Sequence, residues 1–575
     1  MSIIEIRNLT FTYPGASEPT LKNASAVIEK GDFLAIVGNN GCGKSTLCKT
    51  LNGLIPHFIV GDMDGDVIID GLNTKEQEIG TLARKAGYVY QDFENQIVCP
   101  TVLEDASYAC LNYAMPDYEE KGKEALNVCG LSSKIGDYVW QLSGGQKHLL
   151  ALAGTAALSP DILILDEPIA QLDPAHADGI YEVLKRLNEK YGKTIIVIEH
   201  HTDYIVKYCK DVMLLKDGGV QWVLPAKEAM RRTAELQGCN IFPPQVAIAA
   251  ERMIDAGLLP KEPFLQKEEE LPVDVAEGVR VFTPYLKSKG PAYKQPLQRE
   301  LKRDTIVDFK NVTVKYRAVK GEPPKIFDDF SLQIGKGEKI ALIGSNGAGK
   351  STMLKMMMGL IRPESGQVLL NDRPTADLPK EELGRTISMV YQNPEEMFIK
   401  DSIRKDIEYA MMVRKVEDYQ KRTDELLEMF RLTDLQDRDG RLLSGGQMRR
   451  ASLAIGIALQ PEILLLDEPT ANLDIATRRE IMKTLQMLKG ITDTVVIATH
   501  DMQLVCDWAE RLIVLSAGYV IADGTKEEIF ADMYVRQQVG IRPPQICDMG
   551  RALGIENPCF TIDEFMEYFR GEKYA

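Results

Sequence analysis

The stretch Gly38-Asn-Asn-Gly-Cys-Gly-Lys-Ser45 decides the fold, and it recurs as Gly344-Ser-Asn-Gly-Ala-Gly-Lys-Ser351. Both copies fit G-x-x-x-x-G-K-[ST], the pattern of a phosphate-binding loop, and each stands between a strand-like apolar run and a helix-prone run. Glycines let main-chain N–H groups converge on phosphate oxygens, and a helix N-terminus favours negative charge. A glycine turn before a helix would explain one copy; two copies in the same context predict two nucleotide sites.

The side chains at the end of each loop have predicted tasks. Lys44 and Lys350 are expected to reach the β- and γ-phosphates, and the serines that follow them are expected to bind Mg²⁺. The predicted nucleotide contacts of the two loops are Gly38, Asn39, Gly41, Gly43, Lys44, Ser45 and Thr46, and Gly344, Asn346, Gly347, Gly349, Lys350, Ser351 and Thr352.

Composition narrows the class of protein. A chain of 575 residues is long enough for more than one domain, and its net charge of −16 disfavours broad binding to nucleic acid. Its ten cysteines form no C-x-x-C pair, so they predict reduced thiols rather than a zinc or iron–sulfur site. No apolar run approaches a membrane span, and the first residues show no signal peptide. We therefore expect a cytosolic protein whose membrane role, if any, comes through a partner.

The chain repeats itself at a nearly constant offset. Lys44 and Lys350 differ by 350 − 44 = 306 positions, and His200 and His500 by 500 − 200 = 300. A period this long indicates a duplicated domain rather than a short-repeat array. The predicted boundaries are 1–225 for the first nucleotide-binding domain, 226–260 for its C-terminal extension, 261–303 for a linker, 304–524 for the second domain and 525–575 for its extension.

Each half has the pattern of an α/β core. Ile162–Leu165 and Thr194–Ile198 are continuous apolar runs, as expected of parallel strands that are buried on both faces. Between the phosphate loop and these strands, residues 92–158 have a helical pattern. The sequence thus predicts two α/β units, each with a helical insert.

Paired carboxylates follow one apolar run in each half. Asp166-Glu167 comes directly after Ile162–Leu165, and Asp467-Glu468 takes the same place in the second half. An aspartate at the end of a buried strand beside a phosphate loop is expected to hold Mg²⁺, and the next glutamate to orient or deprotonate the attacking water. An acidic turn after a strand is the alternative that the phosphate loops disfavour.

A third motif, Leu-Ser-Gly-Gly-Gln, occurs once in each half, at 142–146 and 443–447. Physically, a serine and two glycines at a helix start form either an anion cradle or an ordinary helix cap. Phosphate loop, LSGGQ and Asp-Glu, in that order and twice, resemble the ATP-binding cassette (ABC) ATPases. The resemblance covers nearly the whole chain except the linker and the C-terminal tail, and LSGGQ is highly specific to the family.

The resemblance implies a fold and a set of site residues. It implies α/β cassettes in tandem, each with a mainly parallel core sheet, an antiparallel β subdomain and a helical subdomain, plus small helical extensions. Gln91 and Gln392 match the family's glutamine loop, and His200 and His500 its switch histidine. The implied catalytic residues are Glu167, Glu468, His200, His500, Gln91 and Gln392, and the implied magnesium ligands are Ser45, Gln91, Asp166, Ser351, Gln392 and Asp467.

The family's cassettes close head-to-tail, with each ATP between one phosphate loop and the other cassette's LSGGQ. The resemblance therefore implies that Lys44 shares one ATP with Ser444, and Lys350 the other with Ser143. The implied contacts from the signature motifs are Ser143, Gly144, Gly145, Gln146, Ser444, Gly445, Gly446 and Gln447. Asp173 and Asp474 match the loop that communicates across the dimer, and Tyr13 and Tyr316 stand where an aromatic ring stacks on adenine, although a simple turn is the alternative there.

The stretch Asp92–Asp105 indicates which ABC proteins this chain is most like. Its Asn-Gln pair and Thr-Val-x-x-Asp pattern are similar to the ATPase subunits of energy-coupling factor (ECF) importers. The second copy, 393–403, departs at the Asn-Gln pair and resembles the second half of the fused, tandem form. The resemblance implies two membrane partners, a transmembrane scaffold subunit and a substrate-capture subunit, for a vitamin, a vitamin precursor or a transition metal ion. The implied location is the cytoplasmic face of the membrane, with the cargo set by another chain.

Some positions depart from the pattern and some alternatives stay open. Leu149 stands where the second copy has Arg450, and Ile169-Ala-Gln-Leu-Asp173 differs from the more usual Thr470-Ala-Asn-Leu-Asp474, so the two sites need not be equal. The rival function is a soluble tandem ABC protein such as a ribosome-associated translation factor, which the proline-broken, mixed-charge linker disfavours. A DNA-repair ATPase would need a long coiled coil, and no sustained heptads occur.

Overall fold

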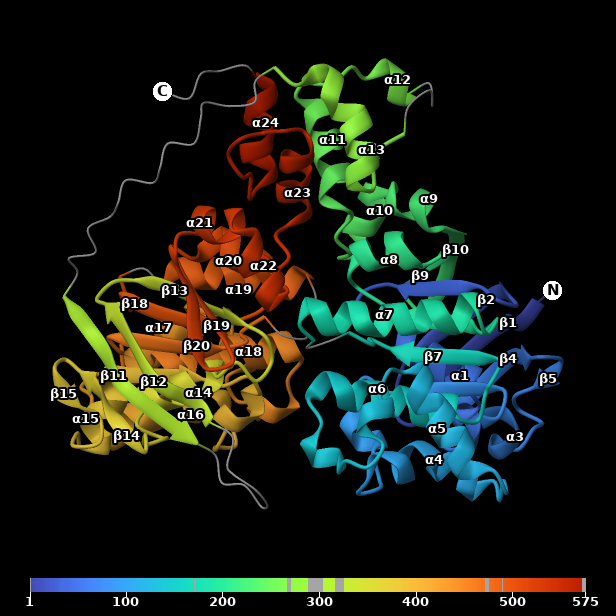
Figure 1. The fold of residues 1–575 in the computed structure, drawn as a ribbon, viewed down its shortest axis with the longest axis horizontal. Helices are drawn as coiled ribbons and strands as arrows, with labels where there is room; N and C mark the ends of the chain where they lie inside the picture. The colour runs from blue at the N-terminus through green and yellow to red at the C-terminus, as the bar shows by residue number, and fades with distance from the viewer. Residues whose placement is uncertain are drawn as a thin grey trace. The chain divides into compact units, whose positions relative to one another are not determined.

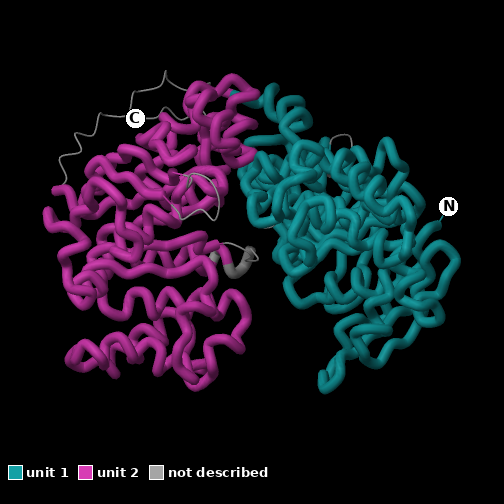
Figure 2. Tube along the Cα trace, turned by 60° about the horizontal axis from the view of Figure 1, so that its bottom comes forward, with its two compact units in different colours: residues 1–286 teal, residues 287–575 magenta. Residues whose placement is uncertain are grey.

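The computed structural model divides into two compact units, residues 1–286 and 287–575 (Figure 2). It describes residues 2–169, 172–265, 270–287, 304–315, 325–470, 475–488 and 490–570. Each unit has one six-stranded sheet and one four-stranded sheet with helices around them. The prediction of two α/β units in tandem is confirmed.

The core sheet of unit 1 is parallel except at one edge. Strands β9, β3, β8, β7 and β6 run parallel, and β10 pairs antiparallel with β9. In spatial order the strands are β10 (Gly219–Pro225), β9 (Asp211–Lys216), β3 (Phe33–Val37), β8 (Thr194–Ile198), β7 (Ile162–Asp166) and β6 (Ala86–Val89). Because the parallel strands share one direction, the loops after their carboxyl ends gather at one edge of the sheet.

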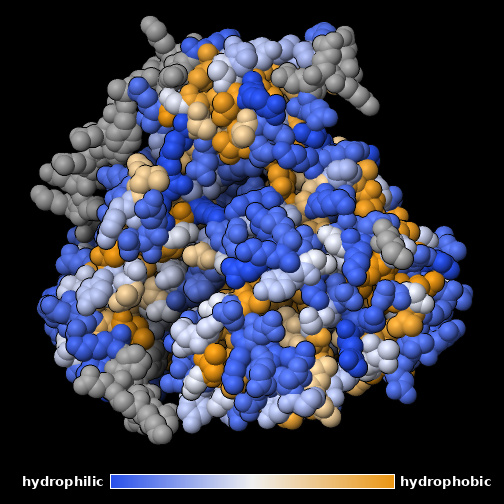
Figure 3. Space-filling model, turned by 45° about the vertical axis from the view of Figure 1, so that its right-hand side comes forward, coloured by the Kyte–Doolittle hydropathy of each residue, from blue (hydrophilic) through white to orange (hydrophobic). Residues whose placement is uncertain are grey.

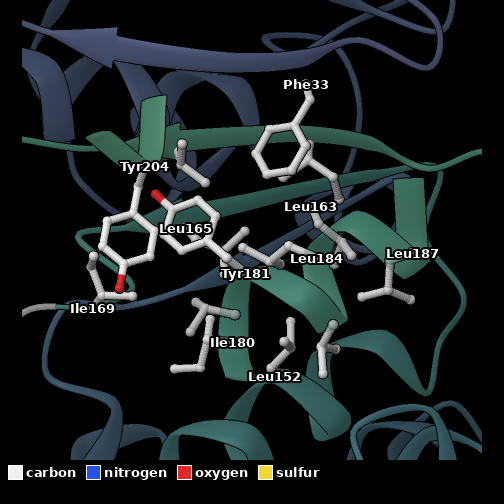
Figure 4. Close-up of a cluster of buried hydrophobic side chains, with 14 of the residues drawn as sticks. Phe33, Leu152, Leu163, Leu165, Ile169, Ile180, Tyr181, Leu184, Leu187 and Tyr204 are labelled. Atoms are coloured by element: carbon white, nitrogen blue, oxygen red, sulfur yellow. The ribbon is translucent and has the colours of Figure 1, made fainter. Parts of the chain in front are cut away.

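Alternate residues of the central strands serve two different cores. Leu163 and Leu165 of β7 pack in one cluster with the helix α7 (Pro174–Glu189), while Ile162 and Ile164 pack in a second cluster on the other face. Figure 4 shows the first cluster, where the ring of Tyr181 lies among Leu163, Leu165 and other apolar side chains. Burial on both faces explains why β7 and β8 are apolar at every position.

An antiparallel sheet and a helical insert complete unit 1. The sheet has the order β2 (Leu21–Glu29), β1 (Ser2–Thr12), β4 (Asp62–Ile69) and β5 (Leu72–Asn73). The insert comprises α4 (Val102–Asn112), α5 (Tyr118–Val128) and α6 (Gly144–Ala156), which lie together in Figure 1, away from the C-terminal helices of the unit. The predicted helical pattern over 92–158 therefore corresponds to this insert, preceded by the short turn η1 (Phe93–Gln96).

Unit 2 repeats this plan. Its sheets have the orders β12-β11-β14-β15 and β16-β17-β18-β13-β19-β20. The strands are β11 (Thr305–Lys315), β12 (Lys325–Gly335), β13 (Lys339–Gly344), β14 (Ser365–Leu370), β15 (Arg373–Pro374), β16 (Ile387–Val390), β17 (Ile463–Asp467), β18 (Thr494–Ala498), β19 (Arg511–Ser516) and β20 (Tyr519–Gly524). The main helices are α14 (Lys350–Met357), α16 (Ile403–Val413), α17 (Tyr419–Met429), α18 (Gly445–Ile457) and α19 (Ile475–Met487).

Short helices extend each unit beyond its sheets. In unit 1 these are α9 (Ala226–Met230), α10 (Thr233–Gly238), α11 (Gln245–Asp255), α12 (Glu262–Leu265) and α13 (Val275–Phe282). In unit 2 they are α21 (Lys526–Ala531), α22 (Met533–Val539), α23 (Gln545–Ala552) and α24 (Ile562–Arg570). The Pro-Pro-Gln repeat ends at the first residue of α11 in one unit and of α23 in the other.

The predicted linker at 261–303 needs correction at its beginning. Residues 261–286 belong to unit 1, where α13 is held by ion pairs from Lys227 to Asp274 (2.9 Å) and Glu277 (2.7 Å). Val273 and Phe282 are completely buried, and the Val273 N–H donates to the Glu277 carboxylate at 3.1 Å. The sequence pattern did not reveal this, because the basic partner comes from α9, which is distant from α13 in the sequence. Residues 288–303 lie outside the described part of the chain.

The polar character of the surface agrees with the amino-acid composition. The face in Figure 3 is mostly hydrophilic, with apolar residues in separate patches. Among the residues that the structure describes, no helix has the length and apolar character required to cross a bilayer.

Candidate active site

The first phosphate loop leads from β3 into α1 (Lys44–Leu51). Gly43 precedes the helix with φ of +102°, a conformation that residues with a Cβ rarely adopt. The buried ammonium of Lys44 donates to the carbonyl oxygens of Gly38 (2.8 Å) and Asn39 (2.9 Å). The loop therefore wraps around its own lysine, next to the free N–H groups of a helix N-terminus.

The second loop has the same geometry. Gly349 has φ of +102° before α14, and the buried Lys350 donates to the carbonyl oxygens of Gly344 (2.7 Å) and Ser345 (3.3 Å). A buried cation bound to main-chain carbonyls beside a helix N-terminus suits a polyphosphate, which supplies the negative charge that the carbonyls only partly provide. In both units, then, the residues present fit the triphosphate of ATP.

An aspartate carboxylate lies next to the last serine of each phosphate loop. Asp166 at the end of β7 accepts hydrogen bonds from the hydroxyl groups of Ser45 and Tyr88, the latter at 3.0 Å. Asp467 at the end of β17 accepts a hydrogen bond from Ser351. Burial raises the pKa of both aspartates, because a charged carboxylate loses solvation there. A serine hydroxyl and a buried carboxylate form an oxygen donor set suited to Mg²⁺.

Glu167 lies where three predicted catalytic residues meet. One carboxylate oxygen accepts from the Gln91 amide at 2.9 Å, and the other lies 3.1 Å from His200 Nε2. Burial by itself would raise the pKa of Glu167, but the hydrogen bond from His200 and the charges of His200 and Lys44 outweigh it and lower the pKa. Glu167 is thus held as an ionised carboxylate, the form that accepts a proton from water.

The main chain at this glutamate is strained in both units. Glu167 has φ of +50° and Glu468 has φ of +46°, in the left-handed region that non-glycine residues seldom occupy. Their N–H groups donate to the carbonyl oxygens of Ile198 (3.2 Å) and Ala498 (2.9 Å), the last residues of the neighbouring strands. Such outliers concentrate at functional sites, where the surrounding structure fixes them.

In unit 2 the glutamate and histidine also pair, but the glutamine does not join them. His500 Nδ1 lies 2.9 Å from Glu468, and although burial opposes it, the Glu468 carboxylate raises the pKa of His500. No hydrogen bond joins the Gln392 side chain to Glu468 in the described part of this unit. The two sites therefore contain the same residues in different arrangements.

Both signature motifs form helix caps. The Ser143 hydroxyl accepts from the Gln146 N–H (3.3 Å) at the start of α6, and the Gln146 side chain accepts from the Ser143 N–H (3.0 Å). Ser444 and Gln447 repeat this capping box at the start of α18. Both serines are exposed, and their described contacts are to their own helices, not to the phosphate loop of their own unit.

Several other predicted residues can be placed. The Tyr13 hydroxyl lies 3.1 Å from Thr46 Oγ1, beside the first phosphate loop. The side chain of Asp173 caps α7 and lies 2.8 Å from Nδ1 of His176, a residue that the sequence analysis missed. A Cβ at Gly145 would collide with the His176 ring, which thus lies against the signature helix. Their predicted partners in unit 2, Tyr316 and Asp474, lie outside the described residues.

A second residue that the sequence analysis missed is Glu199, directly before the switch histidine. Its buried carboxylate accepts hydrogen bonds from the main-chain N–H groups of His200 and His201, both at 2.8 Å, and from the Tyr181 hydroxyl at 2.6 Å. Unit 2 has Thr499 in this place. An acidic residue at the end of an otherwise apolar strand was the signal that could have revealed it.

Comparison with known proteins agrees with this geometry. Residues 21–170 and 327–471 match the family model described as ABC transporter. An inferred ABC transporter ATP-binding protein of Methanosarcina acetivorans is 30% identical over 99% of this chain and 94% of its own length. A protein described in the same way from Clostridium perfringens is 30% identical over 100% of this chain and 99% of its own.

A solved structure is similar to part of the chain. The structure of cbiO1 from Clostridium perfringens, described as part of the ABC transporter complex cbiONQ, is 30% identical over 42% of this chain and 94% of its own, with a TM-score of 0.37. The family model matches each half once, over the strands and loops that carry the phosphate loop, the signature motif and the paired carboxylates. The chain belongs to the ABC transporter family, as an ATPase with two ATP-binding cassettes in tandem that bind ATP with Mg²⁺.

Proposed function

We propose that this chain is the ATPase subunit of an ECF-type importer, and that it powers uptake of a vitamin, a vitamin precursor or a transition metal ion. The observation that carries the proposal is a pair of exposed apolar loops, one in each unit, at equivalent positions after the glutamine loop. Val98 is 62% exposed and Ile399 is 61% exposed. Their positions differ by 399 − 98 = 301, the offset of the signature motifs.

The same hydrogen bonds hold both loops. In unit 1, one carboxylate oxygen of Asp105 accepts from the N–H groups of Val98 (2.8 Å) and Cys99 (2.9 Å). In unit 2, Asp406 accepts from Ile399 (2.9 Å) and Lys400 (2.8 Å) in the same way. Each aspartate lies in the first turn of the next helix, so the main chain is fixed while the apolar side chain faces solvent. An apolar side chain that is held in solvent by a fixed main chain suits contact with a protein partner.

The adjoining helices extend these surfaces. Tyr108 and Leu111 of α4 are exposed, as are Met412 and Val413 of α16. Two matching apolar surfaces on one chain fit a membrane scaffold subunit that presents two contact segments, one to each cassette. The chain would then lie at the cytoplasmic face of the membrane, held by its scaffold and capture subunits. The cargo would be chosen by the capture subunit.

For the reaction, we propose that the two units close head-to-tail around two ATP molecules. One ATP would contact the loop of Lys44 and the signature Ser444, and the other the loop of Lys350 and Ser143. The exposed signature serines support this, because among the described residues their helix starts bond within their own helices and not to the phosphate loop of their own unit. ATP would favour the closed state because it bridges both units, and hydrolysis would remove the bridge.

Within each site, this chain's residues have distinct proposed tasks. The loop lysine binds phosphate oxygens, and the loop serine, the strand-end aspartate and the loop glutamine hold Mg²⁺, which neutralises phosphate charge when it is bound. Glu167 and Glu468 orient the attacking water and accept its proton, and His200 and His500 fix the position of these carboxylates and bond the γ-phosphate. Tyr13 and Tyr316 stack on adenine, and Asp173 and Asp474 link the two sites.

Membrane association of the full-length chain tests this function. An affinity-tagged chain is expected in the membrane fraction, to copurify with integral membrane proteins, and to yield a small molecule that mass spectrometry can identify. The double substitution Val98→Glu with Ile399→Glu is expected to abolish copurification and to retain ATP binding. Tyr519→Glu, at another exposed apolar position, is the matched control. Sedimentation with ribosomes, or copurification that is unchanged in the double variant, would contradict the proposal.

A further inference from the structure

The two cassettes differ at a buried position in the helix that each signature motif begins. Arg449 of α18 and His148 of α6 are equivalent, since 449 − 148 = 301 is the offset of the signature serines. Both side chains are 2% exposed. Neither position belongs to the motifs that identify the family in this sequence, and buried charged or polar groups need a physical reason.

Arg449 binds the main chain of the glutamine loop. Its Nη1 donates to the carbonyl oxygen of Tyr391 at 2.8 Å, and its Nη2 donates to that of Gln392 at 2.7 Å. Burial lowers the pKa of Arg449 to about 10, and the nearby charges of Glu468 and Asp467 oppose this shift, so the guanidinium stays charged at neutral pH. Two charge-assisted hydrogen bonds from one planar group fix the orientation of the peptide that carries Gln392.

His148 makes no such link. Its ring stacks on Phe93 with the centroids 4.4 Å apart and an interplanar angle of 18°. Neither ring nitrogen has a hydrogen-bond partner in the described structure, and burial lowers the pKa of His148 to about 4, so the ring is neutral. In this unit the Gln91 side chain instead contacts the catalytic Glu167.

The neighbouring position, which differs more obviously in the sequence, does not explain the difference. Arg450 donates to the carbonyl oxygen of Phe430 at 3.0 Å, at the end of α17, and so lies away from the glutamine loop. Leu149, its equivalent, packs against the core of unit 1. Of these two neighbours, Arg449 is thus the one that bonds the glutamine loop. Unit 1 joins its signature helix to this segment in a different way, because the Gln96 amide donates to the Thr155 hydroxyl of α6 (3.2 Å) and to the carbonyl oxygen of Tyr88 (2.9 Å), and no arginine bonds the peptide of Gln91 in the described residues.

We propose that Arg449 is a positioning residue for ATP hydrolysis: it ties the glutamine loop of unit 2 to its signature helix, and the histidine at 148 leaves unit 1 without this tie. The inference rests on the proposed role of Gln392 as a Mg²⁺ ligand. With the main chain of the loop fixed, Gln392, which makes no hydrogen bond to Glu468 in the described part of unit 2, would be ready for the cation. In unit 1, Gln91 must first leave Glu167, so the two sites are expected to differ in their Mg²⁺ requirement.

The test is the Mg²⁺ dependence of ATP hydrolysis by the full-length chain at saturating ATP. Arg449→Gln is expected to lower kcat roughly tenfold and to raise the Mg²⁺ concentration for half-maximal activity by a similar factor, because two charge-assisted hydrogen bonds are lost. Its KM for ATP at saturating Mg²⁺ is expected to change less than about twofold. Arg449→Lys keeps the positive charge on a single nitrogen but loses the planar fork that bonds two carbonyls. Its kcat and its Mg²⁺ requirement are expected to lie between those of the unmodified chain and those of Arg449→Gln. His148→Leu, the matched control in unit 1, is expected to stay within about twofold of the unmodified chain.

Gln392→Ala separates this inference from the proposed function. If Gln392→Ala raises the Mg²⁺ requirement and Arg449→Gln does not, the tie is overturned while the role of the glutamine stands. If Arg449→Gln acts and Gln392→Ala does not, the arginine does not work through the glutamine, and the inference is again overturned. A thermal unfolding curve for each variant identifies a lower kcat that comes from a loss of folded protein, and a lower kcat with an unchanged Mg²⁺ requirement would also contradict the tie.

Discussion

The hydroxyl group of Tyr181 donates a 2.6 Å hydrogen bond to the carboxylate of Glu199 inside unit 1. Tyr181 stands in α7, the helix that begins at the Asp173 cap, and Glu199 directly precedes the switch histidine. Figure 4 shows the Tyr181 ring between apolar side chains and the ring of Tyr204. The bond therefore joins the helix of the aspartate loop to the loop of the histidine through the core of the unit.

Tyr181→Phe is expected to destabilise unit 1 by about 1–3 kcal/mol, because a buried carboxylate would lose a donor that no water replaces. Urea unfolding followed by tryptophan fluorescence measures the change. Tyr208→Phe is the matched control, since the Tyr208 hydroxyl donates to an exposed glutamate, Glu182, at 2.8 Å. The control is expected to change stability by less than about 0.5 kcal/mol. If the two substitutions change the free energy of unfolding equally, the buried hydrogen bond contributes no more to stability than the exposed one.

Replacing either of the proposed catalytic glutamates by glutamine is expected to lower ATP turnover and to trap ATP. Glu167→Gln and Glu468→Gln each remove the carboxylate that we propose accepts the proton from water, and the double substitution is expected to lower turnover at least about 100-fold. Steady-state ATPase assays and retention of labelled ATP on the chain measure the two effects. If one single substitution leaves turnover untouched, the site of that glutamate does not hydrolyse ATP.

Alkylation of Cys42 is expected to block the first ATP site, and bound ATP is expected to protect the thiol. Cys42 lies inside the phosphate loop and is only 7% exposed, and burial raises its pKa despite the opposing charge of Lys44. The thiolate is the reacting form, so labelling is expected to be slow at neutral pH and to accelerate about tenfold per pH unit.

Cys42→Ala is the control for this experiment. The second loop has Ala348 in the equivalent place, since 348 − 42 = 306, so the substitution is expected to preserve ATP binding while the inhibition disappears. Mass spectrometry of the modified peptide over a range of ATP concentrations gives the protection. A labelling rate that does not depend on ATP would count against the placement of this thiol in the site.

Unit 1 is expected to lose stability on mild acidification because of His148. The usual pKa of 6.5 applies in the unfolded chain, whereas burial lowers the pKa of the folded His148 to about 4. Between these values the unfolded state binds a proton that the folded state does not, so stability is lost as the pH falls. At pH 5 the loss is about 2 kcal/mol relative to neutral pH.

Thermal unfolding between pH 7 and pH 5 measures this dependence. His148→Leu places an apolar side chain against Phe93 instead of the stacked ring, removes the two unpaired ring nitrogens and is expected to flatten the pH profile. A variant with the same pH dependence as the unmodified chain would show that other groups cause the acid sensitivity.

Much of this molecule follows from local sequence. The glycines of the phosphate loops need positive φ, the apolar runs at 162–165 and 463–466 need burial on both faces, and the Ser-Gly-Gly-Gln motifs cap helices through contacts three residues apart. Such requirements act within a few residues, so the sequence alone determined two α/β cassettes and their order, and it predicted the candidate residues of each nucleotide site.

Tertiary structure decided what depends on side chains that are distant in the sequence. Gln91 meets Glu167 in one unit while Arg449 holds Gln392 in the other, and α13 joins unit 1 through Lys227. These partners are 50 to 76 positions apart or differ between the halves at an inconspicuous residue, so no local period reveals them. Whether a buried polar group finds a donor is settled only when the strands and helices pack, and that packing makes two cassettes with the same motifs unequal.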